Sequence, residues 1–244
     1  MAPKSLFIPS VFTFLNFFWG FFAIVKTIEG NLHAAAWFII LAILCDGMDG
    51  KLARWTNCET PFGFELDSMG DLVSSGLAPA LLAFVGGLHQ VGFLGMLICF
   101  LYLFGGGYRL ARFNVLQAGD RSKGYAGLPI PVAGLAVASL WLFDSPFGHT
   151  VASGWWIALM IFLGVFMVST VHYDWPRLMF RGSWKNVVQS VGILLAVGMM
   201  AVFPQWSLFP LFLLYILLGV GNWAVGLIKG DVALTDFFLL VRKQ

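Results

Sequence analysis

The sequence predicts an all-α polytopic membrane protein: a helical bundle with about eight transmembrane helices and both termini in the cytoplasm. Of its 244 residues, 59% are hydrophobic and only 11% are charged, and its mean hydropathy is +0.87. Soluble domains carry roughly 25% charged residues. Apolar runs long enough for a spanning helix, which needs about 20 residues, recur along the chain. We therefore expect a single membrane-embedded domain over residues 1–244.

Short polar or Gly/Pro-rich breaks separate the apolar runs and place the helices in order. The first run follows Lys4 but lacks a small-residue cleavage pattern, so we expect a retained helix rather than a signal peptide. Short connections favour antiparallel neighbours, and the glycine triplet at 105–107 permits close helix contact. The expected spans are 7–27, 33–54, 64–86, 91–113, 128–145, 152–172, 187–203 and 208–228.

The basic residues predict the orientation of the chain in the membrane. With the N-terminus inside, 13 of the 14 lysines and arginines fall on the inner side, and only Lys26 falls outside. Positive charge accumulates on the cytoplasmic side of membrane proteins. We therefore expect both termini, and any site on this side of the membrane, to face the cytoplasm. The near balance of 14 basic and 12 acidic residues argues against a nucleic-acid-binding surface.

Four aspartates lie at membrane depth in the second and third expected spans. Such carboxylates are costly, and four close together repel one another unless cations neutralise them. Asp46 and Asp49 are three residues apart, and Asp67 and Asp71 are four apart, so each pair shares a helix face. Each pair lies about 12 Å from the intervening turn at about 1.5 Å per residue, so the two pairs can meet at one depth.

Four converging carboxylates form an all-oxygen site that suits hard divalent cations, and we expect two ions of Mg²⁺ or Mn²⁺. A two-metal carboxylate site is suited to phosphoryl transfer, because the ions neutralise charge as the leaving group departs. A cation channel, a carrier or a proton relay also uses buried aspartates. Spacing alone leaves these functions, and a purely structural role, open.

The residues around the aspartates carry a longer pattern. From Asp46 to Asp71 the chain matches D-x2-D-G-x2-A-R-x8-G-x3-D-x3-D at all eight specified positions, and it therefore resembles the CDP-alcohol phosphotransferase family. Gly50 and Ala53 leave room for a flat base or ribose beside the helix, and Arg54 offers a fixed positive fork for a diphosphate. Helix packing with an inside-facing arginine is the structural alternative.

Within this family, the chain resembles integral-membrane phosphatidylserine synthases over roughly residues 5–135, the expected catalytic core. The flanking matches lie at 9–16, 108–114 and 124–131. The resemblance implies a homodimer in which CDP-diacylglycerol donates a phosphatidyl group to L-serine and CMP is released. It also implies a protein of the prokaryotic inner membrane with its active site facing the cytoplasm. The enzymatic alternatives use glycerol phosphate, inositol phosphate or archaeal ether-lipid substrates with the same chemistry.

The resemblance also assigns roles to residues. One metal would be held by Asp46, Asp49 and Asp67, and the second by Asp46, Asp67 and Asp71. Asp71 would also be the catalytic general base that receives the proton of the serine hydroxyl. The expected CDP-lipid-binding residues are Thr13, Asn16, Gly50, Ala53, Arg54, Thr60 and Gly63. For Thr13 and Asn16, which share a face of the first span, buried hydrogen bonding is an equal alternative.

Three basic residues are candidates for binding the serine or a phosphate. Arg109 and Arg112 are three residues apart near the inner end of the fourth span, so they share a helix face. A guanidinium there can bind the serine carboxylate or a donor phosphate, or it can anchor the helix at lipid phosphates. Lys123 precedes the stretch at 124–131 and either helps close the polar pocket or is a solvated loop lysine.

Overall fold

The computed structural model describes residues 7–56, 60–119, 127–148, 152–171, 173, 198–200 and 202–229. Within these residues the secondary structure is helical and contains no strand, which confirms the all-α expectation. The elements are α1 (Phe7–Ile28), α2 (Leu32–Thr56), α3 (Pro61–Asp71), η2 (Leu72–Leu77), α4 (Ala78–Gly86), η3 (Leu88–Val91), α5 (Phe93–Gly119), α6 (Ile130–Asp144), η4 (Ser145–Phe147), α7 (Ser153–Val168) and α9 (Pro204–Lys229).

Six segments of the described chain are long and apolar enough to cross a membrane, which identifies an integral membrane protein. They are Val11–Ile28, Leu32–Asp49, Pro61–Gly86, Phe93–Val115, Ile130–Phe147 and Pro204–Gly226. The expected span at 152–172 coincides with α7, an apolar helix of 16 residues. The expected span at 187–203 falls largely outside the described residues, as do both termini, so the count of eight stays a prediction.

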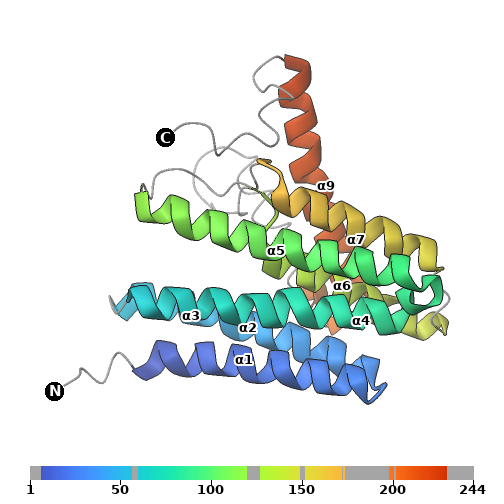
Figure 1. The fold of residues 1–244 in the computed structure, drawn as a ribbon, viewed down its shortest axis with the longest axis horizontal. Helices are drawn as coiled ribbons and strands as arrows, with labels where there is room; N and C mark the ends of the chain where they lie inside the picture. Colours follow the sequence, from blue (N-terminus) through green and yellow to red (C-terminus); the bar gives the residue numbers. More distant parts are fainter. Residues whose placement is uncertain are drawn as a thin grey trace.

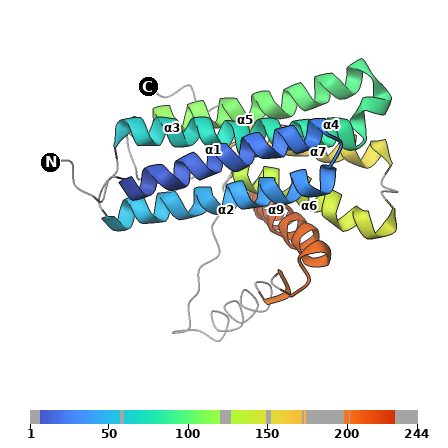
Figure 2. The same ribbon diagram turned by 90° about the horizontal axis from the view of Figure 1, so that it is seen from below.

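The helices that carry the aspartates lie side by side. Figures 1 and 2 show α1, α2, the continuous α3–η2–α4 segment and α5 with roughly parallel axes, whereas α9 crosses the bundle steeply. α1 packs along α2 and also contacts α3, η2 and α4. On the other side of the bundle, α5 packs against α7 and α6 against α9. The end of α2, the start of α3 and the end of α5 therefore gather at one end of the bundle (Figure 1).

Small residues explain the close contact of α5 and α7. A Cβ atom on Gly105 would lie 2.9 Å from the carbonyl oxygen of Gly164, and one on Gly106 would lie 2.5 Å from the end of the Ile130 side chain. Any side chain at Gly105 would push the two helix backbones apart. The glycine triplet thus does what its composition predicts, because it lets helix backbones approach each other closely.

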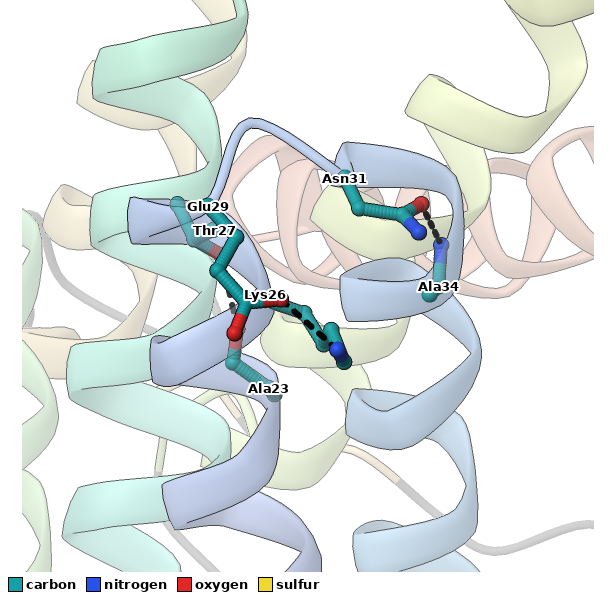
Figure 3. Close-up of polar contacts among 6 residues, drawn as sticks. All are labelled: Ala23, Lys26, Thr27, Glu29, Asn31 and Ala34. Atoms are coloured by element: carbon teal, nitrogen blue, oxygen red, sulfur yellow. Dashed lines mark hydrogen bonds and ion pairs between the residues drawn. The ribbon is translucent and has the colours of Figure 1, made fainter.

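A tight turn joins α1 to α2 and fixes their antiparallel pairing (Figure 3). Gly30 adopts a φ of 78°, a conformation that favours glycine. Asn31 caps α2, since its Oδ1 accepts a hydrogen bond from the Ala34 N–H at 3.2 Å. The Lys26 ammonium pairs with the Glu29 carboxylate at 2.6 Å. This turn lies at the end of the bundle opposite the start of α3 (Figure 1).

Candidate active site

The four aspartates come together between α2 and α3. Carboxylate oxygens of Asp46, Asp49 and Asp67 all lie within 4.8 Å of one another. Asp71, the last residue of α3, interacts electrostatically with Asp46 and Asp67 beside this group. Asp49 is only 4% exposed and Asp71 only 8%. Two short helical spacings thus produce one carboxylate cluster, which we define as Asp46, Asp49, Asp67 and Asp71; Asp46 and Asp67 are half-buried.

The carboxylate cluster fits divalent cations. The Oδ1 atoms of Asp67 and Asp71 are buried and have no hydrogen-bond partner within the described part of the chain. Leaving a buried carboxylate oxygen without a partner is unfavourable, and adjacent negative charges add repulsion. An all-oxygen donor set is the one that Mg²⁺ and Mn²⁺ prefer. The residues present could therefore hold such ions. Clustered carboxylates bind divalent cations in this way in many enzymes that transfer phosphoryl groups.

Thr13 and Asn16 of α1 lie beside the cluster. The Thr13 hydroxyl, which is buried, donates a hydrogen bond of 3.0 Å to Oδ2 of Asp49. Asn16 is fully buried, and neither its amide nitrogen nor its amide oxygen has a hydrogen-bond partner among the described residues. It faces α3 next to Gly70, because a Cβ atom on Gly70 would lie 3.1 Å from the Asn16 Nδ2. A buried amide of this kind has capacity to bind a polar ligand.

Replacing Thr13 with valine is expected to weaken divalent-cation binding. The change keeps the side-chain shape but removes the hydroxyl that orients the Asp49 carboxylate. A hydrogen bond to a charged group contributes about 1.5–3 kcal/mol, so we expect Mn²⁺ affinity to fall roughly tenfold. Titration of the purified protein with Mn²⁺ measures the effect. Thr13→Ser retains the hydroxyl and should bind Mn²⁺ like the wild type; equal losses in both variants would contradict the role of the hydrogen bond.

The two arginines of α5 point to different neighbours. Arg109 is only 7% exposed and interacts electrostatically with Asp71, so it lies within electrostatic range of the carboxylate cluster. The Arg112 guanidinium donates hydrogen bonds of 2.8 Å to the carbonyl oxygens of Val168 and Ser169. Arg112 thereby joins α5 to the end of α7. Substrate binding by either arginine stays a prediction.

Of the remaining predicted ligand-binding residues, Thr60 and Gly63 lie at the start of α3, and the side chains of the others are outside the described part of the structure. Thr60 is exposed and caps α3, since its Oγ1 accepts a hydrogen bond of 3.0 Å from the N–H of Gly63. Pro61 follows at the first helical position, which its fixed φ favours. Gly50, Ala53 and Arg54 belong to α2, but their side chains lie outside the described residues, as does Lys123. Their predicted roles stay predictions.

A hydrogen-bonded network between α3 and α5 was not predicted from the sequence. The Ser68 hydroxyl donates to Oδ1 of Asn114 at 3.2 Å, and the Asn114 amide donates to a carboxylate oxygen of Glu65 at 3.0 Å. This network ties α3 to α5 one residue away from Asp67. The signal available in the sequence is an asparagine at the inner end of a span, close to two arginines.

Comparisons with known proteins agree with this geometry. The family model described as CDP-alcohol phosphatidyltransferase matches residues 6–167, which is more than half of the chain and includes the whole carboxylate cluster. The chain belongs to the CDP-alcohol phosphatidyltransferase family. The resemblance drawn from the eight motif positions is therefore confirmed.

Individual relatives of this CDP-alcohol phosphatidyltransferase are similar to it over most or part of the chain. The CDP-diacylglycerol–serine O-phosphatidyltransferase of Helicobacter pylori is 30% identical over 231 residues, covering 93% of this chain and 94% of the relative. An archaetidylserine synthase of Methanothermobacter thermautotrophicus is 35% identical over 70% of each chain. The Bacillus subtilis CDP-diacylglycerol–serine O-phosphatidyltransferase is 37% identical over 55% of this chain and 75% of its own.

Proposed function

We propose that this CDP-alcohol phosphatidyltransferase transfers a phosphatidyl group from CDP-diacylglycerol to L-serine, giving phosphatidylserine and CMP. The observation that carries the proposal is the carboxylate cluster, which lies within the part of the chain that the family model matches. Serine as the acceptor is supported by the names of relatives from two bacteria and one archaeon. When bound, two divalent cations, Mg²⁺ or Mn²⁺, neutralise the charge that develops on the diphosphate.

The residues of the chain support direct attack of the serine oxygen on the phosphorus that carries the diacylglycerol. In this step a bond forms between that oxygen and phosphorus, and the bond from phosphorus to the CMP oxygen breaks. Asp71 accepts the proton of the serine hydroxyl. Arg109, which is buried and interacts electrostatically with Asp71, supplies a fixed positive charge for the serine carboxylate or for a donor phosphate. No covalent intermediate with the enzyme is required.

An apolar cavity supports a position for one acyl chain of the donor. An apolar cavity of about 540 Å³ runs along η2 and α5, and its lining begins at Leu72, the residue after Asp71. Tyr108, the residue before Arg109, lines the same cavity. Because the cavity is apolar, lies within membrane-spanning segments and includes the chain neighbours of Asp71 and Arg109, we assign it to one acyl chain of CDP-diacylglycerol. The residues lining it include Leu72, Leu77, Phe100, Phe104 and Gly107.

Filling this cavity is expected to reduce activity toward long-chain donors selectively. A Cβ atom on Gly107 would meet only the end of the Leu72 side chain, at 3.6 Å, so Gly107→Phe can project into the cavity. Displacing about two buried methylene groups should lower kcat/KM for a dioleoyl donor roughly tenfold. Activity with a dibutyryl donor should stay unchanged. Leu94→Phe, on an exposed part of α5 outside the cavity, is the control; equal losses with both donors would contradict the assignment.

The proposed function includes an oligomeric state and a membrane location for the protein. We propose a homodimer in the prokaryotic inner membrane, whose carboxylate cluster faces the cytoplasm, where water-soluble serine is available. The positions of the basic residues support this orientation, since 13 of 14 fall on the inner side of the expected topology. The single membrane-embedded domain, with its catalytic core at about residues 5–135, belongs to this proposal and overlaps the family match at 6–167.

The acceptor is tested by the lipid product. Purified protein in detergent is given CDP-diacylglycerol, Mn²⁺ and one acceptor at a time: L-serine, glycerol 3-phosphate or inositol phosphate. We expect phosphatidylserine with serine and no lipid product with the phosphorylated acceptors. A product formed only with a phosphorylated acceptor would keep the transfer chemistry and overturn the proposed substrate. An ether-lipid donor tested in parallel determines which lipid backbone is preferred.

A further inference from the structure

The segment that carries Asp67 and Asp71 changes its helix type directly after Asp71. Leu72–Leu77 form the π-helix η2, at whose end the N–H of Ala78 bonds the carbonyl of Val73, five residues back. Short π-helical turns within α-helices occur frequently at functional sites. Such a turn accommodates an extra residue, which changes the direction of side chains on one side relative to the other by about 100°. The direction of the aspartates relative to α4 therefore depends on η2.

Pro79 explains why the π-helix forms there. In an α-helix the carbonyl of Ser75 would accept a hydrogen bond from the N–H of residue 79, but proline has no N–H and its ring clashes with that carbonyl. The Ser75 carbonyl instead accepts a hydrogen bond of 2.9 Å from the hydroxyl of Tyr102. Tyr102 is fully buried on α5, so this contact is made away from solvent.

Two glycines allow α1 and α6 to pack closely against η2. A Cβ atom on Gly20 of α1 would lie 2.9 Å from the Cβ of Ser74, and one on Gly134 of α6 would lie 3.1 Å from the Cα of Ser75. Both helices therefore contact η2 at close range, while α5 contributes the Tyr102 hydroxyl. The helices α1, α2, α5 and α6 all contact the π-helix, and the Tyr102 hydroxyl bonds its backbone.

We propose that Tyr102 is a positioning residue for the carboxylate cluster. Its hydroxyl bonds the Ser75 carbonyl, which Pro79 could not serve in an α-helix, and holds η2 in the form that directs Asp67 and Asp71 toward Asp46. The inference rests on the proposed function only in taking the cluster as the reactive centre. Its consequence for cation binding can be measured without any substrate.

The first test is the Mn²⁺ affinity of full-length Tyr102→Phe, measured from free Mn²⁺ by electron paramagnetic resonance. Removing the hydroxyl leaves a buried carbonyl without this donor, so we expect Mn²⁺ binding to weaken roughly tenfold. The value of kcat should fall, while KM for serine stays close to that of the wild type. Tyr215→Phe, on α9 away from η2, is the matched control and should retain wild-type affinity.

The second test repeats Tyr102→Phe in a Pro79→Ala background. Alanine restores an N–H at position 79, which lets the segment take the α-helical register in which that N–H bonds the Ser75 carbonyl. In this background the loss of the hydroxyl should change Mn²⁺ affinity less than about twofold. The same loss in both backgrounds would overturn the proposal. So would a Tyr102→Phe protein with wild-type Mn²⁺ affinity and only a lower unfolding temperature, because that is a purely structural effect. If the wild type binds Mn²⁺ but releases no CMP with serine, the proposed function fails and the Mn²⁺ results still decide this inference.

Discussion

Asp71→Asn is expected to abolish serine-dependent CMP release, lowering kcat at least about a thousandfold. Asparagine has nearly the same shape as aspartate, but it accepts no proton from the serine hydroxyl and is a weaker ligand for a divalent cation. Asp71 is buried at the end of α3 beside Asp46, Asp67 and Arg109, where bulk water cannot easily replace it as a base. Single-turnover measurement of CMP release at saturating serine and CDP-diacylglycerol gives the size of the effect.

The control for this variant is another buried aspartate of the bundle. Asp144 is 3% exposed at the end of α6, outside the carboxylate cluster. Asp144→Asn should retain kcat per folded protein, which separates chemistry from folding. An Asp71→Asn enzyme that kept more than about a tenth of the wild-type kcat would exclude Asp71 as the general base.

Removing divalent cations is the change with the second largest expected effect. Chelation should stop CMP release entirely, and adding Mg²⁺ or Mn²⁺ should restore it, because without cations the carboxylates of the cluster repel one another and cannot bind a diphosphate. Cations that bind only the native protein also stabilise it, by about 2.7 kcal/mol at 100 times the dissociation constant. Mn²⁺ should therefore raise the unfolding temperature of the wild type.

Asp49→Asn separates cation binding at the cluster from non-specific effects of salt. Asp49 is one of the three closely spaced carboxylates, so the variant should lose most of the Mn²⁺-induced rise in unfolding temperature. Asp144→Asn should keep the rise. Activity that persisted after thorough chelation would contradict a cation-dependent mechanism.

The convergence of the aspartates could be predicted from the sequence because it depends on local geometry. Helical spacing puts Asp46 with Asp49 and Asp67 with Asp71, and hydropathy places both pairs at membrane depth. The structure adds that the third span begins at Pro61 rather than at residue 64, since Thr60 caps the helix. Boundaries of this kind are set by single side chains, and Thr60 and Pro61 are a recognisable start signal.

The contacts made by Arg112 and Tyr102 could not be predicted in the same way. The Arg112 guanidinium bonds carbonyls more than 50 residues away, and the Tyr102 hydroxyl bonds one 27 residues away. Both contacts depend on how helices pack, which periodicity within one helix does not determine. Pro79 did carry a signal, because a proline inside a span disturbs the hydrogen bonds around it, but its partner on α5 is visible only in three dimensions.

The most direct test of the central claim compares CMP release with serine incorporation in the purified wild-type protein. CDP-diacylglycerol and Mn²⁺ are supplied with and without L-serine, and CMP and phosphatidylserine are quantified in the same sample. The account predicts equal molar amounts of the two products, and neither product when serine or Mn²⁺ is omitted. CMP release that does not depend on serine, or cation flux into sealed vesicles in the absence of any CDP-lipid chemistry, would contradict it.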